Sequence, residues 1–239
     1  TGASRGLGQA IAIGLATAGA NVICSSSRPG GCAETISRIQ ALDKQASEVN
    51  ADLSDAQSVE DLATSAIKNS GGIDILVNVG GTIFRSPAIS YDYQEWQKVM
   101  RVNLDASFLL AQKVAPIMFE RGAGKIINIA SMLSYTGGIT VPAYTASKHA
   151  VAGLTKALAN EWGAQNIQVN AIAPGYFKTD NTQALQDDPV RNKEIQARIP
   201  AARWGEPQDL VGAAIFLASP ASNYVNGHIL AVDGGWLAR

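Results

Sequence analysis

Short apolar runs alternate along the chain with longer stretches whose apolar residues recur every three or four positions. The short runs are rich in β-branched residues and predict strands at 21–25, 46–51, 73–78, 124–130, 168–173 and 229–232. The longer stretches predict helices at 7–18, 33–41, 56–69, 93–119, 143–162, 188–198 and 207–217. This alternation is typical of βαβ units that build a parallel sheet.

Some predicted strands are apolar at nearly every position rather than at every second one, as in the run Ile73-Asp74-Ile75-Leu76-Val77. Such runs are expected where helices cover both faces of a sheet. No linker and no internal repeat divides the 239 residues. The pattern therefore predicts one α/β domain over residues 1–239, with a doubly wound parallel sheet between two layers of helices.

Composition and charge narrow the classes of partner. A formal net charge of -1 and the lack of any basic run give no electrostatic footprint for nucleic acid or for an anionic membrane surface. No apolar run approaches the roughly 20 residues of a membrane-spanning helix, and no export signal opens the chain. Cys24 and Cys32 are too few for a disulfide framework and lack the spacing of a zinc site. We expect a cytoplasmic protein that binds a small molecule and no metal.

A glycine-rich turn opens the first predicted helix, and its sequence is Thr1-Gly2-Ala3-Ser4-Arg5-Gly6-Leu7-Gly8. Glycines let the backbone approach a pyrophosphate, and the helix that follows offers free N–H groups and a positive dipole end. A glycine-rich turn alone is a weak signal. Here a second strand follows the helix, and Asn78-Val79-Gly80-Gly81 ends a later strand at the same edge of the sheet, so the sequence predicts a dinucleotide site.

The turn begins with no strand before it. A dinucleotide-binding turn needs a first strand, normally central in the sheet, to hold the turn and the next helix in place. We therefore expect a short N-terminal segment with that strand to precede Thr1 in the natural protein.

Ser131, Tyr144 and Lys148 form the second candidate site. Ser131 follows a predicted strand, and Tyr144-Thr145-Ala146-Ser147-Lys148 opens a helix. Residues four apart lie on one helix face, so the Lys148 ammonium can sit beneath the Tyr144 phenol. A nearby positive charge lowers a tyrosine pKa from about 10 towards working pH and makes the phenol a general acid/base. Ser131 would bond the substrate oxygen where negative charge develops.

Taken together, these motifs resemble the short-chain dehydrogenase/reductase family over essentially the whole chain. The resemblance implies a Rossmann fold, hydride transfer to or from a nicotinamide cofactor, and a substrate loop at about 176–205. It adds Asn103, which matches a helix asparagine that holds a water in a proton relay, so the catalytic set is Asn103, Ser131, Tyr144 and Lys148. Val79 and Gly80 depart from the family's usual Asn-Ala. The implied cofactor contacts are Gly2, Ser4, Arg5, Gly6, Leu7, Gly8, Ser26, Ser27, Arg28, Asp52, Leu53, Asn78, Gly80, Tyr144, Lys148, Ile172, Pro174, Gly175 and Thr179.

The choice between NAD and NADP depends on the residues after the second strand. An NAD enzyme commonly places an acidic residue there to bind the ribose 2′-hydroxyl, but Ser25-Ser26-Ser27-Arg28 contains none. Arg5 and Arg28 could meet a 2′-phosphate, which suits the guanidinium fork. The residues favour NADP slightly, whereas similar family members are usually linked to NAD.

Within the family, three segments are most similar to dehydrogenases of deoxy sugar acids: 125–134, 173–176 with 181–182, and 198–205 with the tail 235–239. The predicted reaction interconverts a keto and a hydroxyl group on such an acid. A substrate carboxylate needs a cation, and Arg85 is the first candidate and Arg203 the second. An arginine in solvent or in an ion pair is the competing interpretation, and for Arg203 it is the stronger one. The predicted substrate contacts are Arg85, Ser131, Met132 and Tyr144.

Two alternatives remain open. A 3-oxoacyl-[acyl-carrier-protein] reductase shares the glycine turn and the catalytic set, and Arg121 and Lys125 are a thin version of the basic patch that a carrier protein would need. A dinucleotide-binding sensor without turnover would be favoured by a damaged catalytic set, but this one is complete. The resemblance also implies a homotetramer.

Overall fold

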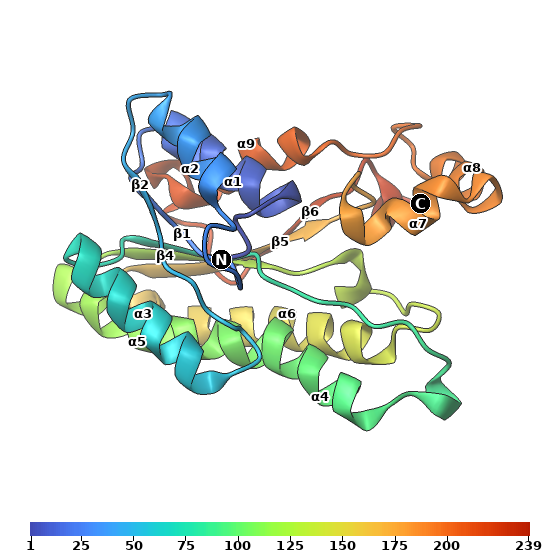
Figure 1. The fold of residues 1–239 in the computed structure, drawn as a ribbon, viewed down its shortest axis with the longest axis horizontal. Coiled ribbons are helices and arrows are strands. Elements are labelled where there is room, and N and C mark those ends of the chain that lie inside the picture. Colours follow the sequence, from blue (N-terminus) through green and yellow to red (C-terminus); the bar gives the residue numbers. More distant parts are fainter.

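A computed structural model describes all 239 residues. Its strands are parallel and lie between two layers of helices (Figure 1). Four strands form one sheet in the order β3-β4-β5-β6, and the other two form a separate pair. The bounds are β1 (Val22–Cys24), β2 (Ala46–Glu48), β3 (Ile75–Asn78), β4 (Gly124–Ile129), β5 (Ile167–Pro174) and β6 (Ile229–Val232). The predicted parallel sheet with helices on both faces is confirmed.

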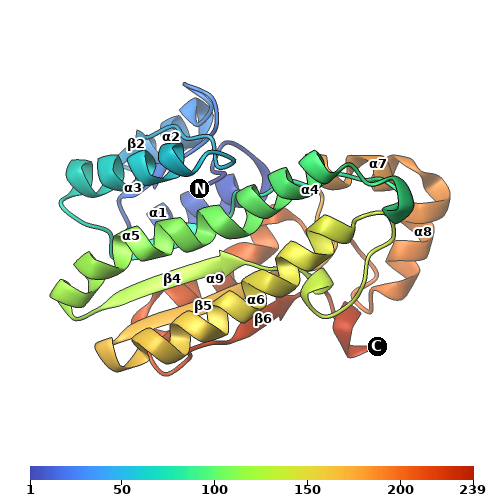
Figure 2. The same ribbon diagram turned by 90° about the horizontal axis from the view of Figure 1, so that it is seen from below.

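The helices divide between the two faces of the sheet. In Figure 1, α1, α2 and α9 lie above it and α3, α4, α5 and α6 below it, while α7 and α8 lie near the C-terminus at one end. Figure 2 shows α5 and α6 running in nearly the same direction as β4 and β5. The bounds are α1 (Gly6–Thr17), α2 (Ala33–Gln40), α3 (Ala56–Ser70), α4 (Tyr93–Met100), α5 (Ala106–Arg121), α6 (Pro142–Trp162), α7 (Gln183–Asp187), α8 (Pro189–Arg198) and α9 (Val211–Ala218).

Two predicted helices differ from what the structure contains. The stretch predicted as one helix at 93–119 is α4 and α5 joined by a π-helical turn at Arg101–Asp105. The stretch at 207–217 begins as a 3₁₀ turn, Pro207–Leu210, before α9. Helix α7 was not predicted, because five residues give too short a pattern to read. None of the helices combines the length and the apolar character needed to cross a bilayer.

The core lies on both faces of the central strands. Ile126 and Ile127 are adjacent in β4 and point to opposite faces, as strand geometry requires. Ile127 joins a cluster with Leu210 of the 3₁₀ turn and Leu217 of α9, whereas Ile126 joins a cluster against α5 and α6. All eight residues of β5 are buried. Two of them are polar, Gln168 and Asn170, and the Asn170 side chain is bonded to Val225 O and His228 N.

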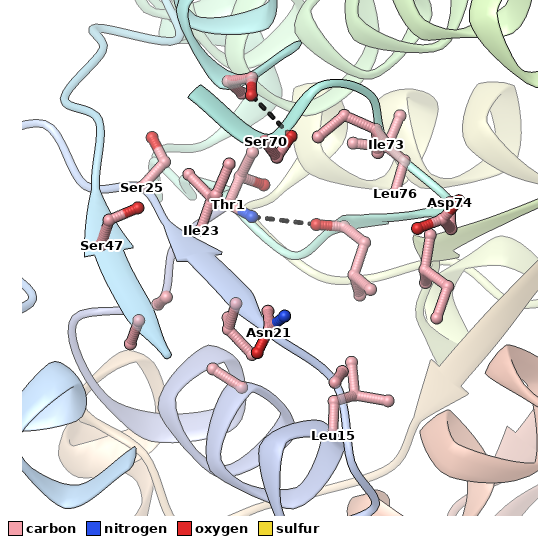
Figure 3. Close-up of a pocket in the computed structure, with 18 of the residues that line it drawn as sticks. Thr1, Leu15, Asn21, Ile23, Ser25, Ser47, Ser70, Ile73, Asp74 and Leu76 are labelled. Atoms are coloured by element: carbon pink, nitrogen blue, oxygen red, sulfur yellow. Dashed lines mark hydrogen bonds between the residues drawn. The ribbon is translucent and has the colours of Figure 1, made fainter. Parts of the chain in front are cut away.

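A slot separates the two sheets. It is a cavity of about 1200 Å³ between β1 and β3, lined among others by Leu15, Ile23 and Leu76, and Figure 3 shows Thr1 within it. The Thr1 amino group donates to Val77 O in β3 at 2.9 Å, and Ala3 N donates to Ser25 O beyond β1 at 3.1 Å. The first residues thus bridge the two sheets as the end of a strand would. The strand expected ahead of Thr1 stays a prediction, for which this slot has room.

Candidate active site

The predicted site residues gather where the strands end. Ser131 follows β4, Asn78 ends β3 and Gly175 follows β5. These carboxyl ends meet at one edge of the sheet, where doubly wound folds bind their ligands. The glycine turn before α1 and the first turns of α6 complete the surroundings.

Tyr144 and Lys148 lie on one face of α6. Pro142 occupies the first turn of this helix, where a missing N–H costs nothing. The Lys148 ammonium lies 5.6 Å from the centre of the Tyr144 ring and donates to Ile129 O, at the end of β4, at 2.5 Å. Only 4% of Lys148 is exposed. The lysine is therefore held beneath the tyrosine, as its spacing predicted.

The predicted direction of the Tyr144 pKa shift is wrong. Burial raises the pKa of Tyr144 above its ordinary value, and this outweighs the lowering by the Ser131 hydroxyl and the Arg85 charge. Burial also lowers the pKa of Lys148 to about 8. Burial disfavours the charged form of both side chains. The prediction considered only the nearby positive charge and did not include this effect of burial.

Asn103 lies in the π-helical turn and is 2% exposed. Its Oδ1 accepts from Thr82 N at 2.8 Å, and its Nδ2 donates to Thr82 O and to Ser147 Oγ, each at 3.0 Å. Ser147 Oγ donates in turn to Tyr144 O at 2.8 Å. Asn103 thus ties the segment after β3 to the first turn of α6. Neither Thr82 nor Ser147 was predicted, and only the position of Ser147 next to Lys148 could have drawn attention to it.

Ser131 caps a 3₁₀ turn formed by Met132–Ser134. Its Oγ accepts from Leu133 N at 3.1 Å, and its N–H donates to Ser134 Oγ at 3.3 Å. The Ser131 hydroxyl also lies near enough to the Tyr144 phenol to lower its pKa, so an oxygen placed between the two groups could accept from both. Met132 is only 6% exposed and packs in a cluster with Trp204 and Trp236.

The glycine turn has the shape that a dinucleotide needs. Gly2 and Gly6 have φ of +65° and +55°, and a Cβ on Gly8 would lie 2.1 Å from Gly2 O. No side chain caps the start of α1, so the N–H groups of its first turn are available to a phosphate. The residues present therefore fit a pyrophosphate: the N–H groups of Gly6, Leu7 and Gly8 would hold it.

The other predicted cofactor residues surround this turn. Leu53 Cδ1 would lie 2.3 Å from a Cβ on Gly80, so the two residues pack closely. The Asp52 carboxylate accepts from Ser54 N and Ser54 Oγ, which lower its pKa. Ile172 differs from the rest, because it lies within β5, fully buried, with its carbonyl bonded to Ala130 N. The remaining predicted positions, which lie at the turn, after β1 or at the ends of β3 and β5, are Ser4, Ser26, Ser27, Arg28, Asn78 and Pro174.

The segment after β5 covers the glycine turn. Thr179 Cγ2 would lie 3.6 Å from a Cβ on Gly6, and Asp180 pairs with Arg5 at 3.1 Å. Arg85 donates to Asn181 O at 3.3 Å and is close enough to Tyr144 to lower its pKa. The exposed Arg85 therefore lies between the tyrosine and this segment.

Arg203, the second candidate for a substrate carboxylate, is already paired. Its guanidinium makes two hydrogen bonds to Asp209, at 2.6 and 3.0 Å. The ion-pair interpretation holds for this residue, so Arg85 is the remaining candidate to bind a substrate carboxylate. No group of three His, Cys, Asp or Glu side chains is arranged to hold a metal ion.

Comparisons with known proteins agree with this geometry. Residues 2–237 match the family model described as Enoyl-(Acyl carrier protein) reductase. The 2-dehydro-3-deoxy-D-gluconate 5-dehydrogenase of Bacillus subtilis is 53% identical over 239 residues, which are 100% of this chain and 93% of that protein.

Two solved structures are also similar. A candidate 2-deoxy-D-gluconate 3-dehydrogenase from Agrobacterium tumefaciens with bound NADP is 50% identical, with a TM-score of 0.92 over 100% of this chain and 94% of that one. A candidate NAD(P)-dependent gluconate 5-dehydrogenase from Beutenbergia cavernae, with NADP at low occupancy, is 48% identical, with a TM-score of 0.96 over 100% and 95%.

Proposed function

Because this chain belongs to the short-chain dehydrogenase/reductase family and is an oxidoreductase of that family, we propose that it interconverts a keto and a hydroxyl group on a deoxy sugar acid. The observation that carries the proposal is the exposed Arg85 guanidinium, which bonds to the segment after β5 and whose charge reaches the proton-transfer residue Tyr144 and lowers its pKa. The relatives named for deoxy-gluconate chemistry support the same class of substrate.

The nicotinamide, when bound, supplies or accepts the hydride, and the protein moves the proton. In reduction, the Tyr144 phenol donates its proton to the substrate oxygen as negative charge develops there, and in oxidation the phenolate takes it back. The Ser131 hydroxyl donates to the same oxygen and stabilises that charge. The Lys148 ammonium stabilises the phenolate, and Asn103 fixes the first turn of α6 through Ser147.

Arg85 would orient the acid. Its side chain is exposed, forms no salt bridge and makes one hydrogen bond, to a backbone carbonyl. A substrate carboxylate can replace that bond with a stronger, charge-assisted one. The keto carbon would then be held at a fixed distance from Tyr144, so the contact between Arg85 and the carboxylate would determine which carbon of the acid reacts.

For the cofactor, we propose a preference for NADP over NAD. Arg28, just after β1, forms no ion pair, and no acidic residue occupies positions 25–28. Arg5 is held by Asp180 through an exposed pair of the kind that contributes little energy, so it can change partner at small cost. The NADP bound in two similar structures supports this preference.

The positions of Arg121 and Lys125 do not support the alternative function, a 3-oxoacyl-[acyl-carrier-protein] reductase. Arg121 and Lys125 lie at the amino end of β4, whereas Ser131 follows its carboxyl end. Arg121 is also paired with Asp74 at 2.6 Å. A patch at the opposite edge of the sheet cannot guide an acyl carrier to the catalytic tyrosine. A complete set of Asn103, Ser131, Tyr144 and Lys148 likewise gives a sensor without turnover no support.

We further propose a cytoplasmic homotetramer, as the family resemblance implies. Light scattering at working concentration checks the assembly, and a monomer there would contradict it.

The test of the activity is oxidation of NADH and NADPH in parallel, with 2,5-diketo-3-deoxygluconate as substrate and an acetoacetyl thioester as the control. We expect turnover of the sugar acid alone, faster with NADPH. Turnover of the thioester alone would overturn the proposed substrate class, and equal efficiency with both cofactors would overturn the NADP preference.

A further inference from the structure

A carboxylate lies beneath the loop that follows β1. Glu48 ends β2, next to Cys24 in register. Its Oε1 accepts from Cys32 N at 2.9 Å and from Ser26 Oγ at 3.0 Å, and its Oε2 accepts from Gly30 N at 3.0 Å. This single side chain holds the loop at its start, near its middle and at the entry to α2.

Asn50 adds a second tether, directed at Arg28. Its Nδ2 donates to Arg28 O at 2.7 Å and to Glu48 Oε1 at 3.0 Å. Gly31 N also donates to Arg28 O at 2.9 Å. The single Ser26 hydroxyl proton is shared between this carbonyl, at 2.9 Å, and Glu48 Oε1. Two N–H donors and a shared hydroxyl thus converge on one carbonyl, while the Arg28 guanidinium forms no ion pair or hydrogen bond in the protein. The backbone of Arg28 is fixed and its charged end is free.

The loop has little order of its own. It contains Gly30 and Gly31, and every residue from Ser27 to Gly30 is exposed. A Cβ on Gly31 would lie 2.4 Å from Ser26 Oγ, so the loop is tightly folded around the Glu48 carboxylate. Without Glu48 and Asn50, a ligand that binds through Arg28 would also have to order this loop, and the lost entropy would weaken its binding.

We infer that Glu48 and Asn50 are positioning residues for cofactor selectivity: they hold the Arg28 backbone so that its guanidinium meets a 2′-phosphate on the adenosine ribose. This rests on the proposed dinucleotide function. A guanidinium binds phosphate through directional, charge-assisted hydrogen bonds, so its benefit depends on where its backbone is held. A ligand without the 2′-phosphate makes no such demand on the loop.

The negative charge of Glu48 is directed into the loop. Burial raises the pKa of Glu48, but hydrogen bonds from Cys32 N, Ser26 and Asn50 outweigh burial and lower it. The carboxylate is thus ionised and occupied by donors from within the protein. It acts on the ligand through the loop rather than by direct contact.

The experiment measures binding of adenosine 2′,5′-bisphosphate and of adenosine 5′-monophosphate by titration calorimetry, which requires no turnover. We expect Glu48→Ala and Asn50→Ala each to weaken the bisphosphate about tenfold, the loss of one charge-assisted contact, and to change the monophosphate less than about twofold. Arg28→Ala should weaken the bisphosphate similarly, and adding it to Glu48→Ala should cost little more. Glu34→Ala, an exposed acid of α2 paired only with Arg38, is the matched control.

Four results would overturn the inference. Tighter bisphosphate binding by Glu48→Ala would mean that Glu48 acts by repulsion. Equal losses for both ligands would mean general damage to the adenosine site, and additive losses in the double variant would mean that Arg28 acts independently. Wild-type protein that binds both ligands equally would remove the 2′-phosphate contact itself. Failure of the wild type to reduce the sugar acid, with selective bisphosphate binding intact, would instead reject only the proposed reaction.

Discussion

Replacing Lys148 with methionine should make the protein inactive and more stable at neutral pH. The side chain is 4% exposed, and burial lowers its pKa from 10.5 to about 8. That difference corresponds to about 3 kcal/mol, by which the folded state is destabilised wherever the ammonium is charged. Methionine has a similar shape without the charge, so it removes this cost.

The variant loses the hydrogen bond from Lys148 to Ile129 O, worth about 1 kcal/mol. The expected net gain in the free energy of unfolding is therefore about 2 kcal/mol at pH 7, or roughly 4–8 °C in Tm for a domain of this size. The sign depends on pH. Below about 8 the lysine is charged in both states and its cost is complete. Between about 8 and 10.5 the folded lysine is neutral while the unfolded one is charged, so the wild type gains stability as pH rises.

Urea unfolding followed by tryptophan fluorescence at pH 7 and at pH 10.5 gives both values. We expect the variant to be more stable at pH 7 and slightly less stable at pH 10.5, with turnover reduced at least 100-fold. Lys156→Met, an exposed lysine of the same helix, is the matched control and should change neither quantity. A variant less stable than wild type at pH 7, or a stability difference independent of pH, would refute the reasoning.

Two further changes test other parts of the structure. Gly8→Ala places a Cβ 2.1 Å from Gly2 O, so we expect the free energy of unfolding to fall by about 1–3 kcal/mol and dinucleotide binding to weaken. Unchanged binding, measured by calorimetry, would contradict the role of the turn. Arg85→Ala should raise KM for the sugar acid by roughly 10- to 100-fold with little change in kcat. Arg203 is already paired with Asp209, so Arg203→Ala should leave KM unchanged. Equal effects of the two substitutions would reject the role of Arg85 in binding the substrate carboxylate.

Local pattern was enough to predict the elements that hold the catalytic side chains. The Tyr144–Lys148 spacing needs only helix geometry, and β4 needs only its apolar run. Even the predicted strand 46–51 agrees with the bonding, since Val49 N and Ala51 N continue to donate to Cys24 O and Ser26 O although β2 ends at Glu48.

The features that escaped prediction depend on contacts between distant residues. Asn103 meets Thr82 across 21 positions of sequence, and this bond accompanies a π-helical turn that no helical periodicity distinguishes. Glu48 meets Ser26 across 22 positions, so nothing near Glu48 in the sequence connects it with Arg28. The raised pKa of Tyr144 likewise follows from burial, which becomes known only when the elements pack.

The hydrogen bonds of Asn103 also join the segment after β3 to the helix that carries the catalytic tyrosine. Thr82 lies in that segment, and Asn103 bonds to it and to Ser147, which bonds in turn to the Tyr144 carbonyl. The Asn103 side chain is 2% exposed, so water cannot easily take over these bonds. A displacement of the segment after β3 would therefore be passed on to the position of the Tyr144 phenol, and a change at Thr82 would alter kcat as well as substrate binding.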